Sequence, residues 1–309
     1  MALFVHARPE LLDRTLECLR DAGAELLYVF SDGPRDAAER AHVDAVRERV
    51  RAIGWTAPIV VEQETNVGLS DSIRRGLDEV FERHECAVVI EDDVCVAPEF
   101  LSFVGRCLAH YVSDQRVAGV TGLRLPFDRA CFADYPFDAF ATPRFHSWGW
   151  ATWRRAWETF DFDADRLARR LRAAHVRPED AGADLTALVD AAIVRRELPG
   201  AWDVFCAASM LVKGQVFMAP AWNLVENTGF TSGTHFSSSP PRWELTWERP
   251  PRRVGVEPRL PPPLVDARIL RAWLAFAAGP RPSRLRRLLP RPAKVALRRL
   301  AALGAHRRS

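Results

Sequence analysis

Short apolar runs alternate with helical stripes over the first 120 residues of the chain. Apolar side chains recur at helical spacing from Leu69 to Phe81, for example, which indicates one buried helix face. The runs predicted as strands are 2–5, 25–30, 58–62, 87–90 and 117–122. The helices predicted between them start at Pro9, span 36–53, follow 69–81 and span 98–111. This alternation predicts an α/β fold with a mostly parallel sheet and helices on both faces.

The regular alternation ends after Gly122. Residues 123–149 are rich in aromatic side chains, proline and aspartate and show no clear period. Helical patterns return over 150–160, 183–196 and 203–212, and two apolar runs are expected as strands that close the sheet, at 215–219 and 223–227. Prolines and arginines dominate from Ser237 onward. The pattern therefore predicts one folded domain over 1–236, with halves 1–122 and 123–236, and a tail over 237–309 that is partly disordered or lies on a membrane surface.

Composition narrows the class of protein. A hydrophobic content of 48% and a charged content of 27% are typical of a globular domain. The net charge of +3 resides in the tail, because Arg281–Ser309 holds ten Lys or Arg and no acid, so no nucleic-acid partner is predicted. The six cysteines form no C-x-x-C pair, which favours reduced thiols over a zinc site. No signal peptide or membrane-spanning run is visible, and we expect a cytoplasmic protein.

Three consecutive carboxylates, Glu91, Asp92 and Asp93, follow the fourth predicted strand. In parallel sheets, ligands gather beyond the carboxyl ends of the strands, and Asp32 follows the second strand in the same way. Acids at such a place either cap a helix and face water, or bind a cation. Because Mg²⁺ and Mn²⁺ are held by one or two carboxylates together with substrate phosphates, the triplet predicts a metal–diphosphate site.

Several motifs resemble those of GT-A fold glycosyltransferases. They are E-D-D at 91–93, S-D-G-P at 31–34, N-V-G-L at 66–69, F-H-S-W-G-W-A-T-W-R-R-A-W at 145–157, A-W-D at 201–203 and N-T-G-F-T-S-G-T-H at 227–235. Their order over residues 1–236 is similar to that of a bacterial hemolysin-like, family 2-like group, which is itself similar to N-acetylglucosaminyltransferase I. The resemblance implies a Rossmann-like half, 1–122, that binds a nucleotide-sugar, and an acceptor half, 123–236.

The resemblance also implies roles for individual residues in donor binding. Asp93 would bind Mn²⁺ or Mg²⁺, and a late loop would cover the donor, with His235 completing the metal shell and Gly233 allowing close approach to phosphate. Glu91 and Asp92 would contact the ribose or support the metal ligand, and Asp32 would accept a hydrogen bond from the base. Arg8, at the end of the first strand, would lie near the base, and Asn66 is also expected to bind the donor. Without the resemblance, the better interpretation of Asp32 is a turn residue, and that of His235 is a solvated loop residue.

The second half offers a catalytic base and an acceptor border. Asp203 would take the acceptor proton by the same resemblance, while its alternative is a helix N-cap. The competing acids in this half are Glu158, Asp161 and Asp163. His146 and Trp148 would border the acceptor. The spacing of the tryptophans that follow predicts one buried helix face for Trp150, Trp153 and Trp157.

The sequence thus predicts a metal-dependent, inverting glycosyltransferase that uses a UDP-linked sugar and a glycan or lipid-linked acceptor in bacterial glycan synthesis. Two alternatives stay open. A sugar-nucleotidyltransferase would need a Gly-rich basic loop after the first strand, where the chain has H-A-R-P-E. A non-catalytic module would bind a glycan or a partner on the same scaffold. The basic tail is either solvated or lies on an anionic membrane, which would place the protein at the inner face of the plasma membrane.

Overall fold

An eight-stranded mixed sheet forms the centre of the computed structural model, which describes residues 1–198, 200–229 and 258–279. The strand order is β3-β2-β1-β4-β8-β6-β9-β7, and β8 and β7 run antiparallel to their neighbours while the other adjacent pairs are parallel. The strands are β1 Ala2–Val5, β2 Tyr28–Ser31, β3 Ile59–Glu62, β4 Cys86–Glu91, β6 Val117–Thr121, β7 Ala139–Thr142, β8 Trp150–Trp153 and β9 Val216–Pro220. The predicted α/β class with a mostly parallel sheet is confirmed.

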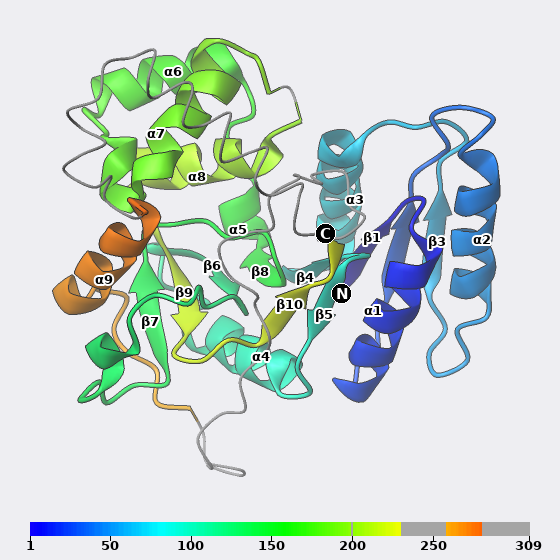
Figure 1. The fold of residues 1–309 in the computed structure, drawn as a ribbon, viewed down its shortest axis with the longest axis horizontal. Coiled ribbons are helices and arrows are strands. Elements are labelled where there is room, and N and C mark those ends of the chain that lie inside the picture. The colour runs from blue at the N-terminus through cyan, green and yellow to red at the C-terminus, as the bar shows by residue number, and fades with distance from the viewer. Residues whose placement is uncertain (199, 230–257, 280–309) are drawn as a thin grey trace, which may run out of the picture.

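Helices cover both faces of this sheet, and each face has its own apolar core. Side chains of α1, α2 and α4 fill one core, and those of α3 and α5–α8 fill the other. In Figure 1, α1 and α2 flank the strands β1–β3 at one end, and α6, α7 and α8 gather at the other. The helices are α1 Pro9–Asp21, α2 Arg40–Arg51, α3 Leu69–Arg83, α4 Phe100–His110, α5 Arg154–Trp157, α6 Ala164–Ala173, α7 Ala183–Val189, α8 Trp202–Val212 and α9 Ala267–Ala277, with short 3₁₀ turns at Arg129–Phe132 and Pro178–Ala181 and a π-helical turn at Asp190–Val194.

The tryptophan stretch folds differently from the helix predicted over 150–160. Trp150 and Trp153 lie on strand β8, and the helix α5 is a single turn that ends at Trp157. Strand residues three apart point to opposite faces, so Trp150 packs in one core and Trp153 in the other. The helical spacing was therefore coincidental, although the predicted burial of all three tryptophans is confirmed.

A second sheet of two strands corrects the expectation for the apolar run at 223–227. The run predicted at 223–227 does not close the main sheet; its strand β10, Val225–Asn227, pairs antiparallel with β5, Val94–Val96. Strand β5 follows directly on the acidic triplet, so this small sheet ties the end of the second half to the predicted metal site. The short strands β5 and β7 and the helix α6 had no clear signal in the sequence.

Part of the predicted tail belongs to the folded body. Residues 258–279 are described, and α9 buries Ile269 and Trp273 against the core that contains α1 and α4. The indole Nε1 of Trp273 donates to the carbonyl of Ala181 at 2.9 Å. Among the described residues, no helix has the length and apolar character that a bilayer crossing requires.

Candidate functional site

A cleft of about 560 Å³ opens beyond the carboxyl ends of β1, β2 and β4. The chain runs from β1 outward to β2 and β3 and then returns to β4 on the other side of β1. Loops that leave β1 and β4 therefore diverge, and such a switch point is where open α/β sheets bind ligands. The polar side chains on its wall include His6, Arg8, Asp32, Asn66, Glu91 and Asp92. Residues predicted separately as donor-binding are thus brought to one cleft.

Arg8 bridges two members of the acidic triplet. Its Nη1 donates to Asp93 Oδ2 at 2.7 Å, and its Nη2 donates to Asp92 Oδ1. The backbone N–H of His6 donates to Asp92 Oδ2 at 3.1 Å, and Thr15 Oγ1 donates to the carbonyl of Asp92 at 2.9 Å. The segment after β1 and the first turns of α1 therefore fix the acids that follow β4.

The single positive charge of Arg8 does not balance the negative charge of the acidic triplet. Burial raises the pKa of Glu91 well above its usual value, and the charges of Asp93 and Asp92 raise it further. Burial also raises the pKa of Asp92 to about 6, in spite of the opposing effect of Arg8. In the described chain, the ion pairs of Asp92 and Asp93 are made with Arg8 alone. The cleft therefore has a surplus of negative charge that a ligand with a cation would relieve.

The residues at this point fit a divalent metal that is shared with phosphates. Asp93 is 8% exposed, and its Oδ1 is buried without a hydrogen-bond partner in the described part of the chain. No group of three or more His, Cys, Asp or Glu side chains within the described residues is arranged to hold a metal alone. A site that supplies one or two carboxylates and relies on substrate phosphates for the rest is the usual arrangement for Mg²⁺. His235 and Gly233 lie outside the described residues.

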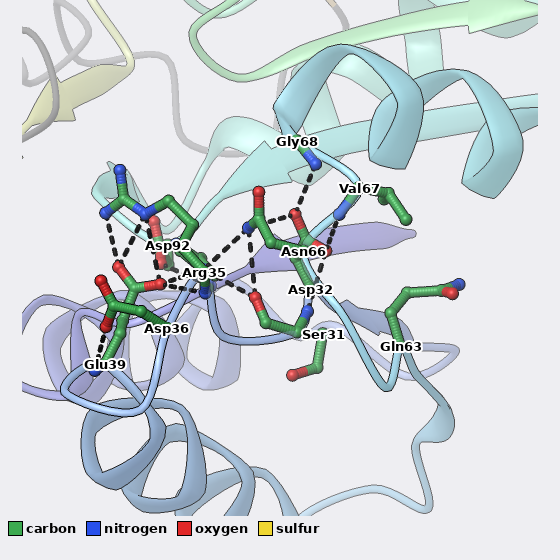
Figure 2. Close-up of polar contacts among 12 residues, drawn as sticks. Ser31, Asp32, Arg35, Asp36, Glu39, Gln63, Asn66, Val67, Gly68 and Asp92 are labelled. Carbon is green, nitrogen blue, oxygen red and sulfur yellow. Dashed lines mark hydrogen bonds and ion pairs between the residues drawn. The ribbon is translucent and has the colours of Figure 1, made fainter.

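Asp32 also lines the cleft, and Figure 2 shows its polar contacts with Asn66, Val67 and Gly68. Its Oδ1 accepts hydrogen bonds from the N–H groups of Gly33 and Val67, at 2.8 and 2.9 Å. Its Oδ2 accepts from Asn66 Nδ2 and from the N–H of Gly68, at 2.9 and 3.0 Å. These four bonds use the acceptor capacity of the carboxylate. In this structure Asp32 therefore holds the N-V-G-L segment that starts α3, and any contact with a base would replace one of these bonds.

Three titratable residues of the cleft, His6, Arg35 and Glu39, were missed in the sequence. His6 Nε2 lies 3.0 Å from the carbonyl oxygen of Gly33 and 3.2 Å from Glu39 Oε2. Glu39 pairs with Arg35, whose hydrogen bond lowers the Glu39 pKa to about 2. His6 carried a usable signal, because it follows directly on the first predicted strand. Glu39 and Arg35 lie before a helix without a distinguishing pattern, and only the fold brings them to the cleft.

Asp203 lies in the first turn of α8. The N-cap of this helix is Ala201, so the alternative role of Asp203 as N-cap is excluded. Its charge raises the pKa of Glu91, which places the two carboxylates within electrostatic reach of each other. Of the competing acids, Asp163 caps α6 by accepting from the N–H of Arg166 at 2.8 Å, and Asp161 pairs with Arg166 and Arg170. Asp203 thus acts electrostatically on the triplet, whereas Asp161 and Asp163 are engaged by residues of α6.

The predicted acceptor residues do not line the cleft. His146 packs edge-on against Trp273 of α9, with ring centroids 5.8 Å apart, and burial lowers the His146 pKa to about 3. Trp148 is half-buried against the core, and its carbonyl accepts from Thr121 Oγ1 at 3.5 Å. A neutral, packed histidine is typical of a structural role. The acceptor role of both residues stays a prediction.

Comparison with known proteins gives only distant likenesses. No protein family and no curated protein matches the sequence. One similar solved structure is a mannosyltransferase from Pyrobaculum calidifontis in complex with GDP-Man and Mn²⁺, with 16% identity and a TM-score of 0.38 over 69% of this chain and 74% of that chain. Another is the inositol-1-phosphate CTP transferase from T. maritima, with 12% identity and a TM-score of 0.35 over 71% and 84%. At this distance the likenesses do not assign a function.

Proposed function

We propose that the chain is a metal-dependent glycosyltransferase that moves a sugar from a nucleotide-sugar, a UDP-linked one, to a hydroxyl acceptor with inversion. The observation that carries the proposal is the triplet after β4. It lies at the switch point of the sheet, has more negative charge than Arg8 balances, and ends in Asp93, whose Oδ1 is buried and finds no partner among the described residues. A divalent cation with a diphosphate would complete this arrangement.

Each residue has a distinct task in this proposal. Asp93 would hold the metal, which supplies Lewis-acid stabilisation for the departing diphosphate. Arg8 would remain near the phosphates as a fixed positive charge. Asp203 would accept the proton of the acceptor hydroxyl while that oxygen bonds to the anomeric carbon, and the electrons of the broken carbon–oxygen bond would leave with the nucleoside diphosphate. Asp203 suits this task because it lies within electrostatic reach of Glu91, in the first turn of α8.

Turnover of a panel of nucleotide-sugars tests the proposal. We expect one donor to be hydrolysed slowly in the presence of Mn²⁺ and not after chelation, with release of nucleoside diphosphate, and Asp93→Ala to abolish that release. Release of pyrophosphate from a nucleoside triphosphate and a sugar phosphate would instead identify a nucleotidyltransferase. If no nucleotide-sugar binds with Mn²⁺ present, the proposal is wrong and the alternative of a non-catalytic binding module is favoured.

A lipid-linked acceptor and a peripheral place at the inner face of the membrane form the remaining part of this proposal. The apolar residues Ile269 and Trp273 are buried in the fold, so a membrane-binding segment would lie beyond Gly279. Flotation of full-length and Arg281-truncated protein with anionic liposomes tests this part. We expect only the full-length chain to float, and equal behaviour of the two would exclude membrane binding by the tail.

A further inference from the structure

The turn Asn227–Gly229 packs against the backbone carbonyl and the side chain of Asp93. Strand β10 pairs with β5 so that Asn227 lies opposite Val94, and the next two residues therefore reach the end of the acidic triplet. The N–H and the Oγ1 of Thr228 both donate to the carbonyl oxygen of Asp93, at 2.8 and 3.1 Å. The backbone of Asp93 is thus held from a segment 135 residues later in the chain.

Gly229 leaves no room for a side chain at this point. A Cβ built on Gly229 would lie 2.2 Å from Asp93 Oδ2 and 3.0 Å from both Cβ and Cγ of Asp93. Contacts this short are not tolerated, because the packed surroundings leave little space for relaxation. The side-chain Oδ1 of Asn227 accepts from the N–H of Gly229 at 2.8 Å, which folds the turn onto the carboxylate.

The turn therefore confines the carboxylate that would bind the metal. Asp93 Oδ2 lies between Gly229 and Arg8 Nη1, which is 2.7 Å away, and this leaves Oδ1 as the oxygen not engaged by the described residues. We infer that Thr228 and Gly229 are positioning residues, which fix the Asp93 side chain so that Oδ1 is presented to the metal–diphosphate ligand. The inference rests on the proposed function for the identity of that ligand. The contact itself does not.

A mutant cycle tests the contact independently of any ligand. We expect Gly229→Ala to lower the melting temperature when Asp93 is present and to lower it much less in an Asp93→Ala background, because the clash is with the carboxylate. Gly105→Ala is the matched control, since Gly105 lies in α4 and has no atom within 4 Å of an added Cβ. An equal loss from Gly229→Ala in both backgrounds, or a failure of both Gly229→Ala proteins to fold, would overturn the inference.

Metal binding supplies the second readout. In calorimetric titrations with Mn²⁺ alone and with Mn²⁺ plus uridine diphosphate, we expect Gly229→Ala to bind about 10- to 100-fold more weakly, the effect of removing the support of a metal ligand. Thr228→Val, which keeps the backbone bond, should show a smaller loss, and Gly105→Ala none. If Asp93→Ala abolishes binding but Gly229→Ala binds like the native protein, the positioning role is wrong. If Asp93→Ala itself binds normally, the proposed metal site fails, while the melting cycle still decides the contact.

Discussion

Two acidic sites in this protein, the single buried Asp161 and the triplet after β4, differ in how their charge is balanced. Asp161 is 4% exposed, and its two oxygens accept from the N–H of Asp163 and from the guanidinium groups of Arg166 and Arg170. Burial alone would raise the Asp161 pKa, but the hydrogen bonds from Arg166, Asp163 and Arg170 outweigh it, and the pKa is lowered. Here one acid meets two arginines, and its partners all come from the chain itself.

The triplet after β4 shows the opposite balance. Three acids share Arg8, burial raises the pKa of Asp92 and Glu91, and Asp93 Oδ1 is unsatisfied within the described residues. An arrangement of this kind destabilises the fold unless something from outside completes it. A buried acid whose charge is compensated by the chain is therefore structural, whereas an acid cluster with surplus charge indicates a site for a cationic ligand.

The largest expected effect is a loss of kcat, which should occur on substitution of Asp203 and not on substitution of Asp161. Asp203→Asn should lower kcat by about 10²- to 10⁴-fold, the range for a lost general base, while Mn²⁺-dependent nucleotide binding persists. Asp161→Asn should leave kcat per folded molecule unchanged. Steady-state assays with the donor found in the panel would measure both. Similar losses of kcat in the two variants would contradict the assignment of the base.

The next largest effect is expected on stability, when the arginine partner of each acidic site is removed. Arg8→Gln leaves Asp92 and Asp93 uncompensated, and we expect it to lower the free energy of unfolding by about 3 kcal/mol, as for other buried pairs that lose one partner. Added Mn²⁺ should recover part of this loss by replacing the missing positive charge. In Arg166→Gln, Asp161 keeps Arg170, so the loss should be smaller and indifferent to Mn²⁺. Thermal unfolding with and without Mn²⁺ would test this, and an equal response to Mn²⁺ in both variants would count against it.

The stability contributions of Asp92 and Asp161 should also change with pH in opposite directions. The folded-state pKa of Asp92, about 6, is above the ordinary value of 3.8, so the folded protein binds more protons between these values and its stability falls as pH rises. The part of this fall that comes from Asp92 should amount to about 3 kcal/mol between about pH 4 and 6, and Asp92→Asn should remove that part. Asp161, with a lowered pKa, should instead lose its contribution as pH falls below 3.8. Chemical unfolding of the metal-free variants at several pH values checks both signs, and an unchanged slope in Asp92→Asn would refute the first.

The first half of the chain could be predicted well from its sequence because each parallel strand is an unbroken apolar run. Residues that follow such runs reach one edge of the sheet, so Asp32 and the triplet were placed correctly without knowledge of contacts. The four hydrogen bonds that occupy Asp32 could not be foreseen, because they depend on how N-V-G-L folds against it.

The second half could be predicted less well, for physical reasons. Strand β8 lies between β4 and β6 and is buried on both faces. Apolar and polar residues therefore do not alternate along it, and Trp150 and Trp153 give no signal that would distinguish a strand from a helix. The electrostatic interaction of Asp203 with Glu91, and the close approach of Gly229 to Asp93, join segments that are far apart in the sequence. For Asp203 only a family resemblance pointed to the site, and Gly229 lay within a resembling motif in which only Gly233 and His235 were given a role.

The most direct test of the central claim is calorimetric titration of Mn²⁺ with uridine diphosphate into the native protein, Asp93→Ala and Asp161→Ala. If the surplus charge of the triplet marks a metal–diphosphate site, the native protein and Asp161→Ala should bind the pair alike, and Asp93→Ala should bind it at least about 100-fold more weakly. Undiminished binding by Asp93→Ala would contradict the account.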